Sequence, residues 1–186
     1  IQKVKQRRDN LMQTAREYYK FRAKAVDVVG SEKDDLFEVV RKSNNETEVK
    51  VFRIRNEGKT LTFHRTFYTN ETNEIRLYGL DDDDIFKITG DVKEGILIRI
   101  IGGLGEEAFI DKSTGGGGSV IIYDTDDEKA EIEAGPNTIN KISNRRAFNI
   151  YNRKDFHYEY DFAMPFPLIG YNPDDGFLLG TSVTVT

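Results

Sequence analysis

The chain has 186 residues, of which 32% are charged and 38% are hydrophobic. This balance is polar for a globular protein, but 12 phenylalanines and 9 tyrosines supply the apolar side chains that a disordered chain lacks. The absence of cysteine excludes disulfides, thiolate nucleophiles and cysteine-ligated zinc, and the absence of a long apolar run excludes a transmembrane helix.

The net charge of −5 is unevenly distributed along the chain. Residues 1–24 contain eight basic and two acidic side chains, a net charge of +6, which leaves −11 for the rest of the chain. A nucleic-acid-binding protein needs a basic surface to replace the counterions of the phosphates. The acidic body of this chain therefore gives no reason to expect nucleic acid as a partner.

Residues 3–26 predict an amphipathic helix, because apolar side chains recur near the helical period of about 3.6 residues. Gly30 and Ser31 end this segment. We expect the apolar stripe to pack on a sheet; a helix that binds a partner or a membrane surface is the alternative. The stripe includes Leu11, Met12, Ala15 and Tyr19.

From residue 35 onward the sequence has the pattern of β-strands. Residues 49–55 and 61–67 carry alternating apolar and polar side chains, and turn-forming residues occupy 43–46 and 56–59. Strands this close in sequence predict antiparallel hairpins.

A strand, an acidic turn and a second strand recur between residues 74 and 127. The turns begin at Gly79 and Gly102, 23 residues apart, and each has a phenylalanine seven residues after its glycine, Phe86 and Phe109. A third strand at 120–123 leads into an acidic turn. This repetition is typical of a small β-solenoid, in which each rung covers the next. We expect both phenylalanines to point inward.

The turn at 102–109 resembles the calcium-binding repeat Gly-Gly-x-Gly-x-Asp-x-U-x, with a glutamate in the position of the aspartate. The turn at 79–86 fits less well, because Asp82 replaces a glycine. In such repeats, turn carboxylates and carbonyl oxygens share one hard cation. The alternative is that the glycines form tight corners without metal. The candidate calcium ligands are Asp81, Asp83, Asp84 and Glu107.

No arrangement of residues predicts a catalytic site. His64 and His157 lack the neighbouring residues of a known zinc or hydrolase motif. The acidic run at 81–84 is expected to be an exposed turn, whereas acid–base catalysis needs paired carboxyl groups in a cleft. We therefore expect this chain to be non-catalytic.

The last third of the chain contains further strand patterns. Residues 115–119, Gly-Gly-Gly-Gly-Ser, predict a flexible loop, and residues 156–162 and 177–185 alternate apolar with polar or small side chains. Because the chain begins with Ile1 and ends within the last alternating run, we expect a piece of a longer protein. The expected parts are an N-terminal helix at 1–30, a β-rich module at 31–170, and at 171–186 the start of a β-barrel or a terminal edge strand.

The expected fold is therefore mainly β, of the α+β class. It combines an N-terminal amphipathic helix, antiparallel hairpins and a short solenoid-like stretch with acidic, glycine-rich turns. A barrel strand separated from its neighbours has unpaired edges. We accordingly expect residues 177–186 to be frayed, or to pair with another copy or a sheet edge.

Several stretches resemble a segment of certain Bacteroidetes envelope proteins. They are Val-Asp-Val-Val-Gly-Ser at 26–31, Glu-Ile-Arg-Leu-Tyr-Gly-Leu at 74–80 and Arg-Ile-Ile-Gly-Gly at 99–103. In that family the segment follows a calcineurin-like metallophosphoesterase domain and precedes an outer-membrane β-barrel of the surface-antigen type. Residues 171–177 resemble the lead-in to the barrel. The metal-binding His and Asp motifs of the phosphoesterase are absent here, so none of its catalytic residues is assigned to this chain.

The resemblance implies a structural module of the bacterial envelope that joins a soluble enzyme, a metal-dependent phosphoesterase, to a barrel. It implies a location on the periplasmic or the surface face of the outer membrane. The implied partners are the flanking domains, with membrane contact through the barrel only. The residues leave open a calcium-stabilised β-solenoid that binds glycan or protein, and, as a third alternative, a hydrolase.

Overall fold

The computed structural model describes residues 2–115, 118–152, 163–174 and 176–185, and the chain divides into two compact units, Ile1–Tyr151 and Asn152–Thr186. The chain is mainly β with one N-terminal helix, which confirms the expected fold class. The first unit contains α1 (Gln2–Ala23), β1 (Ala25–Val29), β2 (Asp35–Ser43), β3 (Glu46–Arg55), β4 (Gly58–Tyr68), β5 (Glu74–Asp81), β6 (Ile85–Asp91), β7 (Leu97–Leu104), β8 (Ala108–Thr114), β9 (Val120–Tyr123), β10 (Glu131–Glu133), β11 (Thr138–Asn140) and the short 3₁₀ helix η1 (Arg146–Asn149). The second unit contains β12 (Ala163–Asn172) and β13 (Gly176–Val185).

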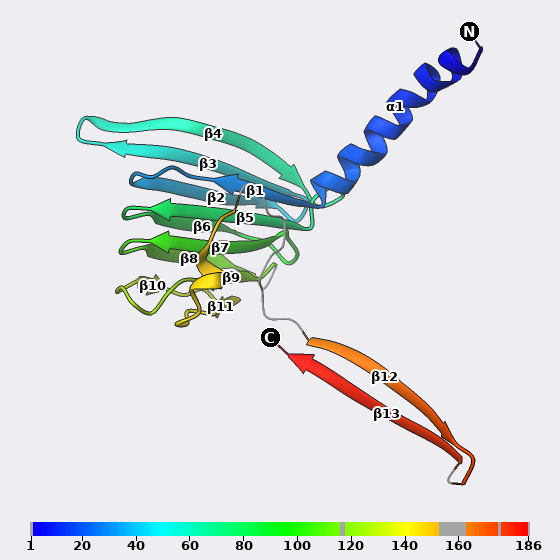
Figure 1. Ribbon diagram of the computed structural model, residues 1–186. Coiled ribbons are helices and arrows are strands. Elements are labelled where there is room, and N and C mark those ends of the chain that lie inside the picture. Colours follow the sequence, from blue (N-terminus) through cyan, green and yellow to red (C-terminus); the bar gives the residue numbers. More distant parts are fainter. Residues whose placement is uncertain (1, 116–117, 153–162, 175, 186) are drawn as a thin grey trace. The chain divides into compact units, whose positions relative to one another are not determined.

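The first unit is a parallel β-solenoid with two sheets (Figure 1). One sheet has the order β1-β5-β7-β9-β11, with every pair parallel. In the other sheet β2, β6, β8 and β10 are parallel neighbours. We number the rungs β1–β2, β5–β6, β7–β8 and β9–β10 as 1 to 4. Ile75 pairs with Ile98 and Phe86 with Phe109, so rungs 2 and 3 repeat after 23 residues, as the sequence predicted.

An antiparallel hairpin is inserted between rungs 1 and 2. Strands β3 and β4 follow β2 and extend the second sheet at its edge, in the order β2-β3-β4. The chain then returns to the solenoid at β5, which pairs with β1 in parallel. The expected antiparallel hairpins at 35–68 are thus confirmed. Because they separate rung 1 from rung 2 in the sequence, rung 1 does not follow the 23-residue spacing of rungs 2 and 3.

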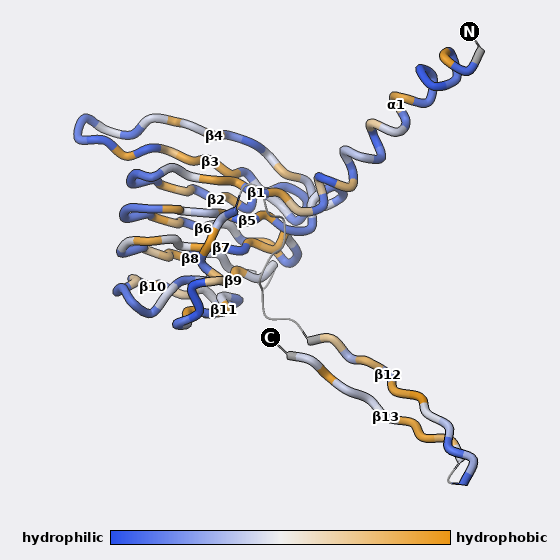
Figure 2. Tube along the Cα trace, viewed as in Figure 1, coloured by the Kyte–Doolittle hydropathy of each residue, from blue (hydrophilic) through white to orange (hydrophobic). Residues whose placement is uncertain are grey.

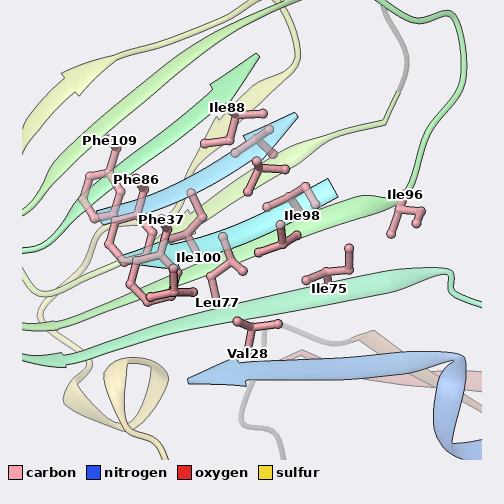
Figure 3. Packing of buried hydrophobic residues seen from close by; sticks show 14 of the residues in the cluster. Val28, Phe37, Ile75, Leu77, Phe86, Ile88, Ile96, Ile98, Ile100 and Phe109 are labelled. Carbon is pink, nitrogen blue, oxygen red and sulfur yellow. The ribbon is translucent and has the colours of Figure 1, made fainter. Parts of the chain in front are cut away.

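The core lies between the two sheets and consists of inward-facing aliphatic and aromatic side chains (Figure 3). Phe86 and Phe109 are both buried, which confirms their expected inward orientation. Their rings are stacked with centroids 5.4 Å apart, because the register places them side by side on neighbouring strands. Alternation along each strand sends every second side chain into this interior.

The prediction that α1 packs on the β body is wrong. Side chains 3–22 are exposed, and Leu11 and Met12 each keep 63% of their surface in solvent. Arg8 and Arg22 fall within the apolar stripe at helical spacing, so burying it would remove charges from water. Near the end of the helix, the Tyr19 hydroxyl donates a hydrogen bond to Glu71 (3.0 Å).

The predicted helix is also too long. It ends at Ala23, which is buried, and residues 25–29 form β1 instead. These residues pair with β5 along their whole length, so tertiary pairing overrides the helical pattern of the sequence. No helix in the described parts of the chain combines the length and apolar character needed to cross a membrane.

The second unit is an antiparallel hairpin in which β12 and β13 pair from Ala163–Val185 to Asn172–Gly176. The expectation that residues 177–186 are frayed, or pair with another copy or a sheet edge, is wrong for the described part of this segment, because β13 pairs with β12 up to Val185. The compact first unit ends at Tyr151, earlier than the expected module boundary at residue 170. The alternating run at 156–162 lies outside the described residues.

Candidate functional site

The turns at one corner of the solenoid stack in register and form two columns of residues. Gly30 follows β1, and Gly79 and Gly102 lie near the ends of β5 and β7. These three glycines, the glycine column, continue the pairing of Val29 with Tyr78 and of Tyr78 with Ile101. An acidic residue stands five positions after each glycine. These residues are Asp35 in rung 1, Asp84 in rung 2 and Glu107 in rung 3.

The glycines are needed because the acidic side chains point inward and fill the space that a Cβ atom would occupy. A Cβ atom at Gly79 would lie 2.0 Å from the carbonyl oxygen of Gly102 and 2.3 Å from Oδ2 of Asp84. A Cβ atom at Gly102 would lie 2.9 Å from Oδ1 of Asp124 and 3.3 Å from Cδ of Glu107. Both positions therefore require glycine for close approach.

The acidic side chains are buried and hydrogen-bonded to the backbone of neighbouring turns. Oδ1 of Asp84 accepts the backbone N–H of Asp35 (2.7 Å), and Oδ2 of Asp35 accepts the backbone N–H of Ser31 (2.6 Å). The residues Asp35, Asp84 and Glu107 are each only 1% exposed. One oxygen of each has no hydrogen-bond partner: Oδ1 of Asp35, Oδ2 of Asp84 and Oε1 of Glu107.

In rung 4 the acidic residue stands at the glycine position instead of five residues after it. Asp124 takes the position of the glycine, because it continues the pairing of Ile101 with Tyr123, and Ala130 takes the position of the acid, next to the pairing of Glu131 with Ala108. The Asp124 side chain is buried and forms a hydrogen bond with Glu107. A row of carboxyl groups therefore continues through four rungs. We call Asp35, Asp84, Glu107 and Asp124 the carboxyl column.

Asn149 is hydrogen-bonded to the carboxyl column at its rung-4 end. Its side-chain amide donates to Oδ1 of Asp124 (3.1 Å) and to the carbonyl oxygen of Gly103, while its Oδ1 accepts the backbone N–H of Gly103 (2.9 Å). The backbone N–H of Thr125 also donates to Oδ1 of Asp124 (2.8 Å). The Asn149 side chain thus anchors the 3₁₀ helix η1 at the carboxyl end of β7.

Burial raises the pKa of three members of the column. It raises the pKa of Asp84 to about 8, with the charges of Asp35, Asp34 and Asp82 adding to the shift. It raises the pKa of Glu107 to about 9, helped by the charge of Asp124 and the hydrogen bond to it. Burial also raises the pKa of Asp124. The raised pKa values favour the protonated forms of Asp84 and Glu107 in the folded state.

The four predicted calcium ligands fall into two groups. Asp84 and Glu107 lie in the buried column, whereas Asp81 and Asp83 are exposed on the turn. Asp83 connects its turn to the turn of the next rung, since its Oδ1 accepts a hydrogen bond from the backbone N–H of Glu106 (2.9 Å). Within the described residues, no group of three or more His, Asp or Glu side chains is arranged to hold a metal ion. Calcium binding by these four residues stays a prediction.

His64 has a partner that the sequence did not reveal. Its Nε2 lies 2.8 Å from Oε1 of Glu48, and Lys42 and Lys50 also contact this carboxylate at 3.0 and 3.2 Å. These residues lie on the neighbouring strands β2, β3 and β4, where cross-strand pairing brings opposite charges together. His157 lies outside the described residues.

Sequence reasoning missed Asp35, Asp124 and Asn149. The spacing of five from Gly30 to Asp35 repeats that from Gly79 to Asp84, and this signal could have revealed rung 1. Asp124 follows no such spacing, because it stands where the other rungs have glycine. Asn149 is distant in sequence from every residue it contacts.

A cavity of about 530 Å³ lies over the first sheet beside η1, in the volume range of small-molecule sites. Tyr78 and Tyr151 line it, with ring centroids 4.7 Å apart. Two of its polar lining residues already serve the fold: Asn149 is bonded to Gly103, and Arg146 pairs with Asp127 at 2.7 Å.

The second unit presents large apolar side chains to solvent. Directly paired residues share a face of the hairpin, so one face carries Ile169, Tyr171, Phe177 and Leu179. Ile169, Phe177 and Leu179 are 76%, 77% and 79% exposed. The other face combines Phe166 and other apolar side chains with small residues. Figure 2 shows hydrophobic positions along both β12 and β13.

No protein family matches this chain, and neither a curated protein nor a solved structure matches it.

Proposed function

We propose that this chain is a non-catalytic structural module of a bacterial envelope protein, in which the solenoid connects a soluble domain to the outer membrane. The soluble domain is a metal-dependent phosphoesterase, as the resemblance of residues 26–31, 74–80 and 99–103 to such proteins implies. The hairpin β12–β13 forms the first two strands of the membrane barrel. The module contributes a spacer between the two.

The hairpin is the single observation that carries this proposal. Each strand has ten residues, the length of about 9–11 residues that crosses a bilayer as a tilted strand. An isolated two-stranded hairpin is marginally stable in water, and exposed apolar patches of this kind mark contact surfaces. In a barrel, lipid would cover one face of the hairpin and further strands on either side would pair with its edges.

The positions of aromatic and polar residues along the hairpin also resemble those in a strand of a membrane barrel. The Tyr171 and Phe177 rings pair at the turn end with centroids 5.0 Å apart, where barrels carry aromatic residues at the membrane boundary. The turn beyond them is polar, and Oδ1 of Asn172 accepts the backbone N–H of Asp174 (3.2 Å). Gly180 and Ser182 lie on the face opposite Leu179, which they share with Phe166 and Leu168.

Tryptophan fluorescence tests the membrane contact of the hairpin. The chain contains no tryptophan, so Leu179→Trp introduces a single fluorophore on the apolar face of β13. The matched control Ser182→Trp places it on the other face of the same strand. We expect vesicles of phosphatidylcholine and phosphatidylglycerol to shift the Leu179→Trp emission to the blue, and lipids brominated in their acyl chains to quench it more than that of Ser182→Trp.

Two outcomes contradict this assignment. One is that vesicles leave both spectra unchanged. The other is that the blue shift of Leu179→Trp appears without vesicles and grows with protein concentration, because the hairpin would then pair with a second copy.

The absence of catalysis is tested separately on the same chain. We expect no hydrolysis of p-nitrophenyl phosphate with manganese above that of a denatured sample. Turnover that survives repurification contradicts the non-catalytic assignment without affecting the membrane assignment.

A further inference from the structure

We propose that α1 binds the surface of an anionic phospholipid bilayer, with its apolar stripe in the interface and its basic side chains on the lipid phosphates. The partner is the lipid surface itself, and the helix lies along this surface. The inference concerns α1 alone and does not depend on the membrane assignment of the hairpin.

The helix presents large apolar side chains to solvent. Val4, Leu11 and Tyr18 are 68%, 63% and 66% exposed, and Met12 beside Leu11 is exposed as well. Val4, Leu11 and Tyr18 stand seven residues apart, so they repeat after two helical turns and share one side of the helix. An exposed apolar surface of this kind marks a contact surface.

The charge of the helix indicates which partner it fits. Residues 1–24 carry a net charge of +6, and the last turn of α1 contains Lys20 and Arg22. Basic clusters on an amphipathic helix bind anionic lipids, because each Lys or Arg near the bilayer is attracted to the negatively charged headgroups. Two copies of such a helix would repel each other, and nucleic acid would leave the apolar stripe in water. An anionic lipid surface accommodates both the positive charge and the apolar side chains.

The basic side chains of α1 lie at positions that suit a helix in a membrane interface. At helical spacing, Lys5 and Arg16 lie on one flank of the apolar stripe and Arg7 lies on the other. Arg8 and Arg22 fall within the stripe and oppose its packing on a sheet. At a membrane interface, a long arginine side chain can keep its methylene stem in the apolar layer while its guanidinium group reaches a phosphate. The residues that disfavour packing on the solenoid are therefore compatible with a lipid surface.

The two acidic side chains of α1 do not oppose this contact. Asp9 and Glu17 lie roughly 160° and 120° around the helix from Leu11, away from the stripe. Glu17 accepts a hydrogen bond from the side chain of Gln13 on that far side (3.0 Å). Asp9 pairs with Arg8 at 2.8 Å, but both side chains are exposed, so the pair is weak and Arg8 can exchange it for a lipid phosphate.

A tryptophan on the stripe of the full chain tests the contact. The chain has no tryptophan, so Leu11→Trp adds a single fluorophore on the stripe, and the matched control Gln13→Trp places it on the far side of the helix. We expect vesicles of phosphatidylcholine with phosphatidylglycerol to shift the Leu11→Trp emission to the blue more than that of Gln13→Trp. Phosphatidylcholine alone should shift it little, and added salt should reverse the shift because salt screens the charges.

Charge variants of the Leu11→Trp chain separate the helix from the rest of the molecule. The helix variant combines Arg7→Gln, Arg8→Gln and Arg16→Gln. The matched control removes three exposed charges from the solenoid instead, by Lys87→Gln, Lys93→Gln and Lys129→Gln. We expect the helix variant to lose about fivefold in affinity for the anionic vesicles for each charge removed, whereas the control should stay within about twofold of the parent.

Three outcomes overturn the proposal. One is that anionic vesicles leave the Leu11→Trp emission unchanged; if they still shift that of Leu179→Trp, the hairpin alone contacts lipid. Another is that charge plays no part, shown by equal shifts with and without phosphatidylglycerol or by equal losses of affinity in the two sets of charge variants. The third is a blue shift without vesicles that grows with protein concentration, because α1 would then bind a second copy.

Discussion

The ring of Phe86 stacks on the ring of Phe37, with centroids 4.6 Å apart and planes 17° from parallel. The two residues are far apart in sequence, but parallel pairing of β2 with β6 places them opposite each other. Phe109 continues the stack on the far side of Phe86. Each phenylalanine of this stack stands two residues after an acid of the carboxyl column, namely Asp35, Asp84 or Glu107, so the same register aligns the rings and these three acids.

Removal of the central ring of the stack should lower the free energy of unfolding. Phe86→Ala removes a fully buried ring that contacts both neighbours, and we expect a loss of about 3–5 kcal/mol in the free energy of unfolding, measured by urea denaturation. The control Leu104→Ala changes a side chain that is 58% exposed, and its effect should stay within about 0.5 kcal/mol. Equal losses would show that Phe86 does not anchor the core.

A methyl group at the glycine column should disrupt the corner. Gly79→Ala places a Cβ atom against the backbone of Gly102, which cannot move aside as a flexible side chain does. We expect a loss of at least about 2 kcal/mol, measured by thermal or urea unfolding. Gly180→Ala in β13 meets its nearest neighbour at 3.8 Å and should leave the unfolding of the first unit unchanged. A silent Gly79→Ala would contradict the close packing of this column.

The exposed helix should tolerate a charge. Leu11→Asp changes a side chain that is largely in solvent, so we expect an effect within about 0.5 kcal/mol on urea unfolding. Ala23→Asp introduces a charge at the buried end of the same helix and should destabilise the chain clearly. Strong destabilisation by Leu11→Asp would show that α1 packs on another surface in solution.

Acid should weaken the charge cluster around Glu48. Hydrogen bonds from Lys42, His64 and Lys50 lower the pKa of Glu48 to about 2. Its contribution to stability is therefore present above the ordinary carboxyl range and is lost as pH falls toward about 2. We expect Glu48→Gln to reduce the stability difference between about pH 5 and pH 2 in urea unfolding. The control Glu38→Gln, whose partner Lys59 is partly exposed, should leave that difference unchanged.

Removal of β13 should not unfold the solenoid. The compact first unit ends at Tyr151, and β13 pairs with β12 in the second unit. We expect deletion of residues 177–186 to leave the melting temperature of the solenoid unchanged, as followed by near-ultraviolet circular dichroism of its buried tyrosines. A large fall in melting temperature would place β13 in the folding unit of the solenoid and remove support for the membrane assignment.

Much of the solenoid follows from local pattern. The glycines at 79 and 102, with their phenylalanines seven positions later, predict rungs 2 and 3 because a repeated turn requires the same residues at the same spacing. Rung 1 obeys the same rule from Gly30 to Phe37, but the inserted hairpin separates it from rung 2 by more than one repeat. The helix prediction was wrong about where the helix ends and about the packing of its apolar stripe. Periodicity shows which side chains share a face, but it does not show what covers that face.

The sequence by itself determined the mainly β class, the repeat and the inward phenylalanines, because these depend on spacing within a single rung and its neighbour. Only the tertiary structure decided that Asp35, Asp84, Glu107 and Asp124 form one buried column, since their contact arises from the stacking of strands distant in sequence. Burial also raises the pKa of Asp84, Glu107 and Asp124, because water is excluded from the corner that these side chains fill.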